Sequence, residues 1–521
     1  MTNRIAIFIA VFALLAIPNS RGYAQVLIQD DFDSTGLIDQ QIWRLPFLGP
    51  GAFYGRTEAK TDRAIHYPQM SGGTAVLQLD TFRNNGMGQS NGLFHGAEIQ
   101  TKRNFVVAGG LKIDVRFRTV DPVPGLVGGA FLFDVGRTNS SGLLVRDEID
   151  FELLSNIPDS LLTNYWNEGP FTGPGAGGTP QFTTPGNGFD ISDFQDYRLE
   201  WYPDRLEWYL NDNLIRVLAN DIPDDPMNFR LNLWAPDSGF PSAFSNSLQP
   251  AANFAANQIF EMEVDSVEIE QLNTARSENL ILNSSFEDPT FPFFNLSNGG
   301  NPDQAATGQW IAFNNVNFST STVNSGNRSL SMFGPFLGGP NASGLFQNID
   351  VSPGEVFEAS VFCRTNSGDS IQGQENFTTI KIEFLNAAGQ VIPGVENTGA
   401  NAKESVILEG RDPGVAENQW VQRQVNAIAP PGATRARVSL LFIQLNNGPG
   451  ATFFDDFEMV RLTPMEFLLG DVNLDGVVNL LDVAPFVDLI SNGGFLDQAD
   501  INGDGVVNLL DVGPFVELLS G

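Results

Sequence analysis

Glu148, Asp150 and Glu152 stand at alternate positions of one short run, and the apolar residues Ile149 and Phe151 lie between them. Because a β-strand sends alternate side chains to opposite faces, the run predicts a strand with three carboxylates on one face. Neighbouring carboxylates repel each other and raise each other's pKa, so such an arrangement is costly. It suits glycoside hydrolysis, in which two carboxylates divide the roles of acid, base and nucleophile. The alternation alone fits an ordinary solvent-exposed acidic strand equally well.

Length and composition limit the number of domains, the fold class and the partners of the chain that contains this strand. The chain has 521 residues, which predicts two to four domains, and short β-rich runs bounded by turn residues favour all-β domains. A formal net charge of −33 argues against nucleic acid as a partner, because phosphate binding needs a basic surface. His66 and His95 are the only histidines, which argues against a histidine-built zinc site. Cys363 stands alone, which excludes an intrachain disulfide.

The N-terminus carries an export pattern. Arg4 precedes an apolar run over residues 5–17, and the small-residue site Gly22-Tyr23-Ala24 follows it. This order predicts a signal peptide over residues 1–24, and the apolar run is short for a bilayer span. An uncleaved membrane anchor is the alternative. We expect a mature chain without a membrane span, either secreted or held outside the cytoplasm at the cell surface.

Residues 25–272 form the first predicted domain. Short runs of β character recur along it, and Gly, Pro, Asn or Asp separates most of them. Two stacked sheets bury such strands, so we expect a β-sandwich. The predicted strands are Ala97–Thr101, Leu111–Arg118, Glu148–Leu154, Leu162–Trp166, Tyr197–Tyr202, Leu206–Leu210 and Phe229–Trp234.

Several motifs of this domain together resemble glycoside hydrolase family 16. Glu148-Ile149-Asp150-Phe151-Glu152 is similar to the E-x-D-x-E signature of that family. Residues 196–210 resemble its strand pair Y-x-x-x-W-x-P-x-x-x-x-W-Y, and Leu231-Asn232-Leu233-Trp234 resembles its N-L-W strand. Residues 163–169 resemble the strand after the signature, and residues 264–269 resemble the closing strand. The matches follow the family's order over nearly the whole domain.

The resemblance implies a concanavalin-like jelly-roll sandwich with a concave face and a retaining mechanism. By position, Glu148 would be the nucleophile, Glu152 the general acid/base and Asp150 the residue that tunes them. Positions four apart on a strand lie about 13 Å apart at about 3.3 Å per residue, whereas retention needs carboxyl groups about 5–5.5 Å apart. Two glutamates that lean together on a concave face can close that gap, and two aspartates cannot. Asp150 can hydrogen-bond Glu148, so we expect the three acids to titrate as a coupled set.

Strand parity, taken with the resemblance, places four substrate-binding residues beside the acids: Asn164, Trp166, Asn232 and Trp234. Trp201 and Trp208 alternate with polar neighbours in a hairpin and are expected in the core, while parity leaves Trp43 open. The family often has a histidine just before its Tyr-x-x-x-Trp strand, where this chain has Gln195 or Asp196. That difference concerns the details of sugar recognition and not the acid pair.

The spacing of the acids bears on the substrate. E-x-D-x-E, without an extra residue between Asp150 and Glu152, resembles the lichenase and xyloglucan-active branch, whereas the laminarinase, agarase and carrageenase branch usually has E-x-D-x-x-E. The resemblance therefore implies a β-glucan with 1,4 linkages, either mixed-linkage glucan or xyloglucan, with laminarin or a galactan as alternatives. The same covalent intermediate would serve hydrolysis or transglycosylation.

Residues 278–463 form a second predicted β-sandwich, after a polar join at residues 272–278. Its opening run 279–287 and its closing run Phe454-Asp455-Asp456-Phe457 resemble those of jelly-roll carbohydrate-binding modules. Trp310 and Trp420 are candidate sugar platforms, although tryptophans in a sandwich are more often core residues, and a structural spacer is the alternative. The predicted strands are Glu355–Phe362, Thr379–Phe384, Ala436–Phe442 and Phe453–Val460.

Residues 470–521 contain one acidic motif twice, with the second copy 29 residues after the first. Oxygen ligands at positions 1, 3, 5, 9 and 12, glycine at position 6 and a backbone carbonyl at position 7 form the calcium-loop pattern. We therefore expect two Ca²⁺ ions in this tail. The predicted ligands are Asp471, Asn473, Asp475, Val477, Asn479, Asp482, Asp500, Asn502, Asp504, Val506, Asn508 and Asp511.

Each calcium loop runs into a helix-like apolar stretch, at Leu480–Ile490 and at Leu509–Leu519. Paired loop-helix calcium repeats at a C-terminus resemble dockerin modules, which implies a cohesin-like scaffold or a cell-surface partner. Leu480-Leu481 and Leu509-Leu510 stand where many dockerins carry Ser/Thr recognition pairs. This departure leaves the cohesin partnership open and hardly affects calcium binding.

The sequence therefore predicts a mostly all-β, secreted, endo-acting retaining glycosidase with a carbohydrate-binding-like module and a small α-helical calcium-binding tail. A transglycosylase on the same site and a non-catalytic polysaccharide-binding surface protein are the alternatives. A lectin would need none of Glu148, Asp150 and Glu152, so their joint presence favours the enzyme.

Overall fold

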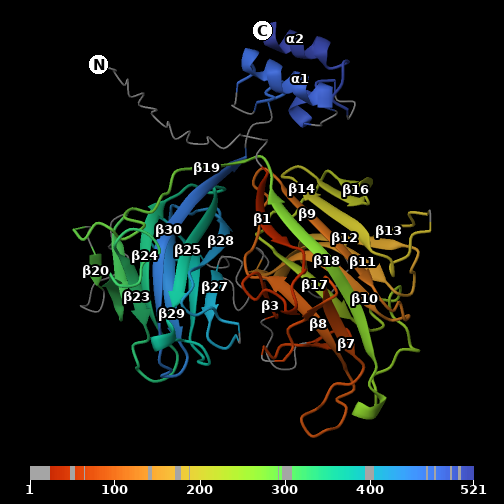
Figure 1. The fold of residues 1–521 in the computed structure, drawn as a ribbon, viewed down its shortest axis with the longest axis horizontal. Coiled ribbons are helices and arrows are strands. Elements are labelled where there is room, and N and C mark those ends of the chain that lie inside the picture. Colours follow the sequence, from red (N-terminus) through yellow and green to blue (C-terminus); the bar gives the residue numbers. More distant parts are fainter. Residues whose placement is uncertain are drawn as a thin grey trace, which may run out of the picture. The chain divides into compact units, whose positions relative to one another are not determined.

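The computed structural model describes residues 24–46, 53–63, 65–138, 144–170, 178–186, 188–290, 293–295, 308–392, 404–412, 414–464, 468–473, 477–492, 496–502 and 506–520. The chain divides into two compact units, of which one comprises residues 25–464 and the other contains the C-terminal module after residue 464 (Figure 1). The predicted signal peptide, apart from Ala24, lies outside the described residues. Among the described residues, none of the helices combines the length and the apolar character that a membrane span requires.

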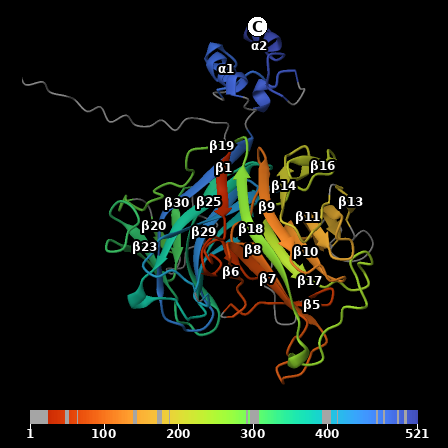
Figure 2. The ribbon, with the colours of Figure 1, turned by 45° about the vertical axis from the view of Figure 1, so that its right-hand side comes forward.

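A two-sheet sandwich occupies the first part of the larger unit, as the runs of β character predicted (Figures 1 and 2). Its first sheet, called the β11 sheet, has the order β13 (Gln181–Thr183), β12 (Leu161–Pro170), β11 (Leu144–Leu154), β10 (Val127–Thr138), β17 (Asn228–Trp234), β8 (Phe94–Thr101) and β3 (Trp43–Arg44). All of these neighbours are antiparallel.

The second sheet, called the β9 sheet, packs against the first. Its order is β16 (Asn213–Leu218), β15 (Leu206–Leu210), β14 (Gln195–Trp201), β9 (Leu111–Thr119), β18 (Ile259–Gln271), β7 (Thr74–Asp80), β6 (Gln69–Ser71) and β2 (Gly36–Leu37), and β1 (Gln25–Asp30) also pairs with β18. The short strands β4 (Phe53–Tyr54) and β5 (Thr57–Ala59) and a 3-10 helix at Phe254–Ala256 complete this sandwich.

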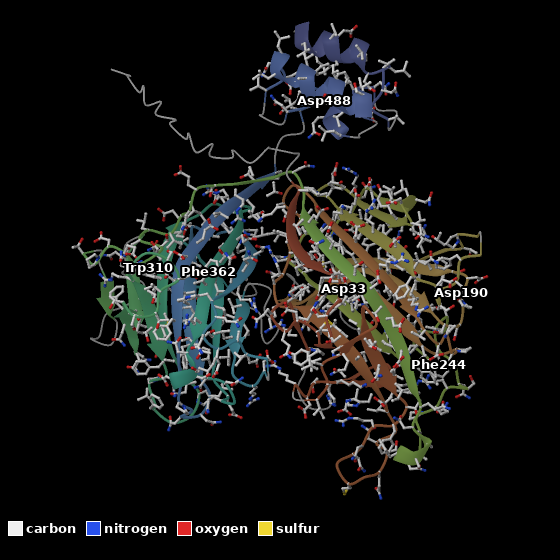
Figure 3. All side chains as sticks on the ribbon, in the orientation of Figure 1. Asp33, Asp190, Phe244, Trp310, Phe362 and Asp488 are labelled. Carbon is white, nitrogen blue, oxygen red and sulfur yellow. The ribbon has the colours of Figure 1, made fainter. Side chains whose placement is uncertain are left out.

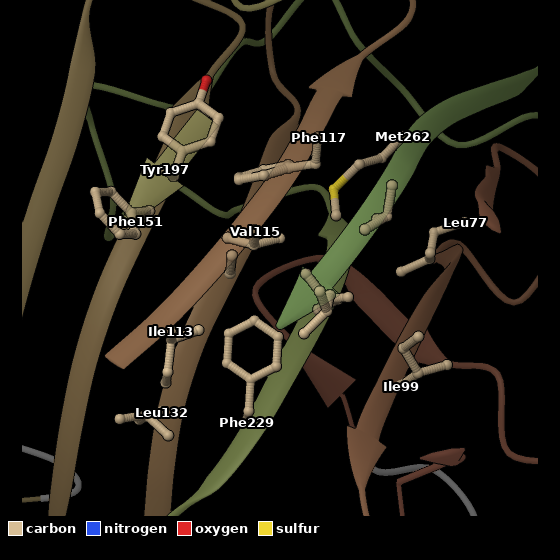
Figure 4. Close-up of a cluster of buried hydrophobic side chains, with 14 of the residues drawn as sticks. Leu77, Ile99, Ile113, Val115, Phe117, Leu132, Phe151, Tyr197, Phe229 and Met262 are labelled. Atoms are coloured by element: carbon tan, nitrogen blue, oxygen red, sulfur yellow. The ribbon is translucent and has the colours of Figure 1, made fainter. Parts of the chain in front are cut away.

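The core of this sandwich lies between the two sheets (Figure 4). Strand β9 shows why the sequence folds in this way, because its buried and partly exposed residues alternate along its whole length. Ile113, Val115 and Phe117 point into the core, where they meet Leu132 of β10 and Phe151 of β11. This strict period of two is the pattern of a strand with one buried face.

The second sandwich has its own core. One of its sheets has the order β22 (Val316–Ser319), β23 (Ser329–Phe333), β30 (Ala451–Pro464), β25 (Val356–Thr365) and β28 (Val421–Ile428), with β19 (Thr274–Arg276) paired to β30. The other has the order β20 (Phe293–Asn295), β21 (Trp310–Phe313), β24 (Asn341–Asp350), β29 (Arg435–Gln444), β26 (Phe377–Leu385) and β27 (Glu404–Glu409). A 3-10 helix lies at Ser367–Asp369.

The tryptophans of the second sandwich differ in exposure. Trp310 is buried in the core and stacks on Phe457 with 5.9 Å between ring centroids (Figure 3). Trp420 is half-buried, and its indole N–H donates to the carbonyl of Val323 at 3.2 Å. Of the two candidate sugar platforms, Trp310 is therefore a core residue.

The C-terminal module consists of two loop-helix copies. A 3-10 turn at Leu480–Asp482 leads into α1 (Val483–Asn492), and α2 (Val512–Ser520) follows the second loop. A further 3-10 turn lies at Asp497–Ala499. Phe486 and Phe515 occupy equivalent positions of the two helices and pack together with 4.1 Å between ring centroids. The module thus has a small core of its own.

Two features depart from the sequence analysis. The central strand β10 is missing from the predicted strands, because Gly128-Gly129 reads as a turn. The predicted polar join contains β19, whose Arg276 lies against the second sandwich through ion pairs to Glu358 and Glu458.

Candidate active site

The three acids lie together on the face of the β11 sheet that is turned away from the core. Ile149 and Phe151 are buried between the sheets, so the alternation places Glu148, Asp150 and Glu152 on the opposite face. Asp150 is buried, whereas Glu148 and Glu152 are partly exposed. The structure therefore brings together the three predicted catalytic residues on one strand with its neighbours β10 and β12 on either side.

A bulge shapes the start of this strand. The register between β11 and β12 shifts between Arg146 and Glu148, so that Asp147 stands at the irregularity. The buried carboxylate of Asp147 accepts the backbone N–H of Glu168 at 2.7 Å, and Glu168 has a φ of 47°. It also accepts the backbone N–H groups of Asp224 and Asp225, both at 3.1 Å. Asp147 thereby fixes the bulge that places Trp166 opposite Glu148.

Arg146 lies on the same face as the acids, next to Glu148. Its Nε is 3.1 Å from Oε2 of Glu148, and both side chains are largely buried. Its guanidinium lies over the ring of Trp166, 4.1 Å from the centroid. The site therefore holds a cation between an aromatic ring and one of its carboxylates.

The electrostatics separate the acids. Burial raises the pKa of Glu148 to about 7, and the cations Arg146 and Arg230 oppose this rise. Burial and then the charge of Glu148 raise the pKa of Glu152 to about 8, and Arg146 opposes it. Burial, followed by Glu148 and Glu152, raises the pKa of Asp150 well above its usual range. The three acids therefore titrate as one coupled set.

The predicted binding residues also face this side. Asn164 and Trp166 of β12 lie opposite Asp150 and Glu148. Asn232 of β17 pairs with Gly129, which in turn pairs with Glu152. Trp234 is half-buried, and its ring meets that of Tyr54 edge-on at 5.5 Å and that of Phe240 at 6.3 Å.

Sequence reasoning missed several residues of this face. Arg230 stands two positions before Asn232 in β17, forms a 3.1 Å ion pair with Glu98 of β8, and lies over the ring of Phe133 of β10 at 4.5 Å. Parity along β17 could have found Arg230, because the same alternation found Asn232. Phe133 was hidden because β10 was not recognised as a strand.

Buried polar atoms without a partner point to a ligand at this face. Within the described part of the chain, Oδ1 of Asp150, Oδ1 of Asn232 and Oη of Tyr54 are buried and make no hydrogen bond. Such atoms are rare in folded proteins and call for an explanation. Hydroxyl groups of a polar ligand would satisfy all three.

The core tryptophans support the site from below. Trp201 and Trp208 are both fully buried, which confirms the prediction. The indole N–H of Trp208, which comes from the β9 sheet, donates to the backbone carbonyl of Asp150 at 3.2 Å. Trp43 is also buried, and its indole donates to Asp30 at 2.8 Å. The β9 sheet thus contacts the acidic strand directly through Trp208.

Comparison with known proteins agrees with this geometry. Residues 58–250 match the family model "Glycosyl hydrolases family 16". The first sandwich is a family 16 domain. Residues 469–513 match the model "Dockerin type I domain", so the C-terminal module is a dockerin type I domain, a class that binds calcium. Both assignments confirm the resemblances of the sequence.

The relatives share only part of their length with this chain. A Crh-like protein of Arthroderma benhamiae is 34% identical over 101 residues, which are 17% of this chain and 25% of that protein. A beta-glucanase of Brevibacillus brevis is 33% identical over 89 residues, which are 17% of this chain and 31% of that protein. The chain thus spans about a quarter to a third of these relatives. A solved beta-1,3-1,4-glucanase (lichenase) derived from a mouse hindgut metagenome has 21% identity and a TM-score of 0.35, over 47% of this chain and 99% of that one.

The two loops of the dockerin domain have matching geometry. The carboxylate of Asp482 is fully buried and accepts the backbone N–H groups of Asn473 and Asn479, both at 2.8 Å. Asp511 is equally buried and accepts those of Asn502 at 3.1 Å and Asn508 at 2.8 Å. A carboxylate has about four acceptor positions, so each retains lone pairs for a metal ion. These residues fit calcium, while the predicted ligands Asp475 and Asp504 lie outside the described residues.

Proposed function

We propose that this protein is an exported, endo-acting retaining glycosidase that cleaves a β-glucan at Glu148 and Glu152. The observation that carries the proposal is the coupled set of three acids on the outward face of β11, with Arg146 beside the first glutamate. A non-catalytic lectin would gain nothing from this arrangement, because buried, mutually repelling carboxylates destabilise the fold.

The chemistry follows from the order in which the acids ionise. In the active form, Glu148 is a carboxylate and Glu152 keeps its proton, as the pKa values of about 7 and about 8 favour. Glu148 attacks the anomeric carbon, the bond from that carbon to the glycosidic oxygen breaks, and Glu152 transfers its proton to the departing oxygen. Glu152 then removes a proton from water, the water oxygen attacks the same carbon, and the ester bond to Glu148 breaks. Two displacements retain the configuration of the sugar.

The remaining residues supply binding and tuning. Trp166 and Trp234 offer aromatic surfaces for the apolar faces of sugar rings. Asn164 and Asn232 offer amide groups for sugar hydroxyls, and the free Oδ1 of Asn232 supports such a role. The E-x-D-x-E spacing favours mixed-linkage glucan or xyloglucan over laminarin or a galactan. If a sugar hydroxyl replaces water in the second step, the product is a transglycosylated chain.

A panel of glycans tests this proposal. We expect wild-type protein to release oligosaccharides from mixed-linkage glucan or xyloglucan, with the β-anomer formed first by NMR. Glu148→Gln and Glu152→Gln should each lower kcat/KM by at least about 10³-fold, because each removes a group that acts only in the reaction. Glu207→Gln, on β15 and outside the site, is the matched control and should stay active. Absence of activity on every β-glucan, or full activity of Glu148→Gln, would refute the enzyme.

The azide ion separates the roles of the two glutamates. With an activated aryl glycoside, azide should restore turnover of Glu152→Ala and give a β-glycosyl azide, because the covalent intermediate on Glu148 still forms. With Glu148→Ala, azide should give the α-glycosyl azide by a single displacement. The opposite pairing of products would exchange the proposed roles. Longer products than the substrate, found by mass spectrometry, would indicate transglycosylation.

The dockerin domain would anchor this enzyme. We infer two Ca²⁺ ions, one in each loop, and a cohesin-like partner on a scaffold or cell surface. Leu480, Leu481, Leu509 and Leu510 are between 67% and 79% exposed and recur in both copies, so the contact surface offered to a partner is apolar. Pull-down with purified cohesins in calcium and in chelator tests this part, and lack of binding to any cohesin would contradict it.

A further inference from the structure

The two sandwiches of the larger unit share a buried interface that several ion pairs cross. The family 16 domain contributes Arg63, Lys102 and Arg103, and the second sandwich contributes acids. No side chain in these pairs is more than 12% exposed. The whole chain has only 28 Lys and Arg residues against 61 acids, so their concentration at one surface is notable. The acids on the other side are Glu358, Glu409 and Asp412.

Asp412 is the centre of one end of this interface. It follows β27 in the second sandwich and is buried. Lys102 Nζ lies 3.3 Å from its Oδ2, while Arg63 Nη1 and the hydroxyl of Tyr67 lie 3.5 Å and 3.3 Å from its Oδ1. All three of these groups belong to the family 16 domain. Arg63 also pairs with Glu409, the last residue of β27, which precedes Asp412 by three positions.

Glu358 of β25 is the centre of the other end. Its two oxygens accept Arg103 Nη2 at 2.8 Å and Arg276 Nη1 at 2.5 Å. Arg276 lies in β19, which pairs with β30, and its other nitrogen reaches Glu458 at 2.9 Å. Glu358 therefore binds both Arg103 of the interface and Arg276 of the segment that connects the two sandwiches.

Between these two ends the interface contains a small apolar cluster and a hydrogen-bonded pair of asparagines. Val106 and Ala108 of the family 16 domain are buried against Val460 and Leu462 of β30. Asn104 and Asn426 exchange three hydrogen bonds through their side chains and backbones, at 2.8 Å, 2.9 Å and 3.2 Å. Domains in one chain move relative to each other by default unless their interface is large and well packed. This interface buries apolar side chains and joins the two sandwiches through buried ion pairs and hydrogen bonds.

We propose that the second sandwich is a permanently docked structural partner of the family 16 domain and supports strand β8 of the β11 sheet. Lys102 directly follows Thr101, the last residue of β8. Ile99 and Ala97, which precede Lys102 by three and five positions, face the core. Glu98 lies between them on the outward face of the β11 sheet and pairs with Arg230. Asp412 thus holds the side chain of Lys102, which directly follows the strand that carries Glu98. The second sandwich then unfolds together with the family 16 domain and is not a freely tethered module.

Calorimetry of the full chain in calcium tests this proposal. The two sandwiches of the wild type should unfold in one transition, apart from that of the dockerin domain. Asp412→Lys places a cation against Lys102 and Arg63. It should therefore lower the midpoint temperature of this transition by about 5 °C or more, or split the transition in two. Asp204→Lys is the matched control, because Asp204 forms an exposed pair with Arg205 in the same unit. It should leave the transition within about 1 °C of the wild type.

Hydrogen exchange adds a local readout. In Asp412→Lys, the amides of residues 94–101 should lose protection by more than those of β15, which lies away from the interface in the β9 sheet. If Asp412→Lys does not fold, Lys102→Met takes its place in both measurements. The proposal would be overturned if the two sandwiches of the wild type unfolded in separate transitions. It would also be overturned if Asp412→Lys and Asp204→Lys had equal melting temperatures and equal exchange rates at the amides of β8. Neither measurement needs glycosidase activity, so the outcome is independent of the proposed function.

Discussion

The guanidinium of Arg146 contacts two side chains on the outward face of the β11 sheet: its Nε lies 3.1 Å from Oε2 of Glu148, and its Cζ lies 4.1 Å from the centroid of the Trp166 ring. The contact with Glu148 favours the ionised carboxylate, and the contact with Trp166 holds the cation in place. Arg146 thus opposes the rise in the pKa of Glu148, the residue proposed as the nucleophile.

Loss of this cation should move the pH profile of the enzyme. Arg146 opposes the rise in pKa of both Glu148 and Glu152, so Arg146→Gln should shift both limbs of kcat/KM to higher pH. Arg146→Lys keeps the charge and should restore much of the wild-type profile while losing the guanidinium contact with Trp166. If activity fell at every pH while the rising and falling limbs of the kcat/KM profile kept their positions, Arg146 would have only a structural role.

The wild-type profile itself should be a narrow bell. The proposed mechanism needs Glu148 ionised and Glu152 protonated, so activity should rise with pH near about 7 and fall near about 8. Because the acids are coupled, these limbs belong to the set and not to single residues. Initial rates at saturating and at low substrate from pH 5 to 10 measure them, and a broad plateau from pH 5 to 7 would contradict the expected ionisation order.

The same acids should weaken the fold at alkaline pH. The pKa of Glu152 is about 8 in the folded state and near 4.5 when unfolded, so the native state binds more protons between these values. Stability from this group is therefore present below pH 4.5 and is lost as pH rises through about 8. Glu152→Gln should melt at about the wild-type temperature at pH 4.5 and about 3–6 °C higher at pH 9. Glu207→Gln, the control on β15, should show no such gain, and an equal gain in both variants would contradict the prediction.

The sequence predicted much of this site because its strands obey strict parity. Glu148, Asp150 and Glu152 fall on one face by alternation alone, and the same rule brought Asn164 and Asn232 beside them. Burial of Trp201 and Trp208 followed from their polar neighbours. The first and last residues of β15 were also predicted correctly, since Asn211-Asp212 marks a sharp turn after it.

Other parts of the site depend on contacts between distant segments. The bulge at Asp147 needs two backbone amides of the loop at residues 224–225, which no local pattern reveals. Strand β10 contains Gly128-Gly129, a pair that in the sequence indicates a turn and not a strand. In the structure, close neighbours require small residues at these two positions. The buried pairs of Lys102 and Arg103 with the second sandwich join residues more than 250 positions apart.

Gly129 should be required for the position of Asn232. A Cβ at residue 129 would come within 2.6 Å of Oδ1 of Asn232, so that side chain would have to turn away. Gly129→Ala should therefore lower kcat/KM by roughly 10-fold to 10²-fold with little change in melting temperature, because the displaced atom ends a flexible side chain. Gly368→Ala is the control, since its Cβ would meet open space. Equal activity of the two variants would show that Asn232 does not contribute to binding.

Calcium should control the folding of the dockerin domain. Its loops close around the buried carboxylates of Asp482 and Asp511, whose charges destabilise the fold unless a cation compensates them. Chelation should therefore abolish the circular dichroism signal of α1 and α2 and expose residues 465–521 to proteolysis, while the melting of the two sandwiches stays unchanged. Calorimetric titration should give two ions for the wild type and one for either Asp482→Ala or Asp511→Ala. Asp488→Ala, on α1 and outside both loops, should still bind two. Fewer than two ions in the wild type, or helices that persist in excess chelator, would contradict a folding role for the metal.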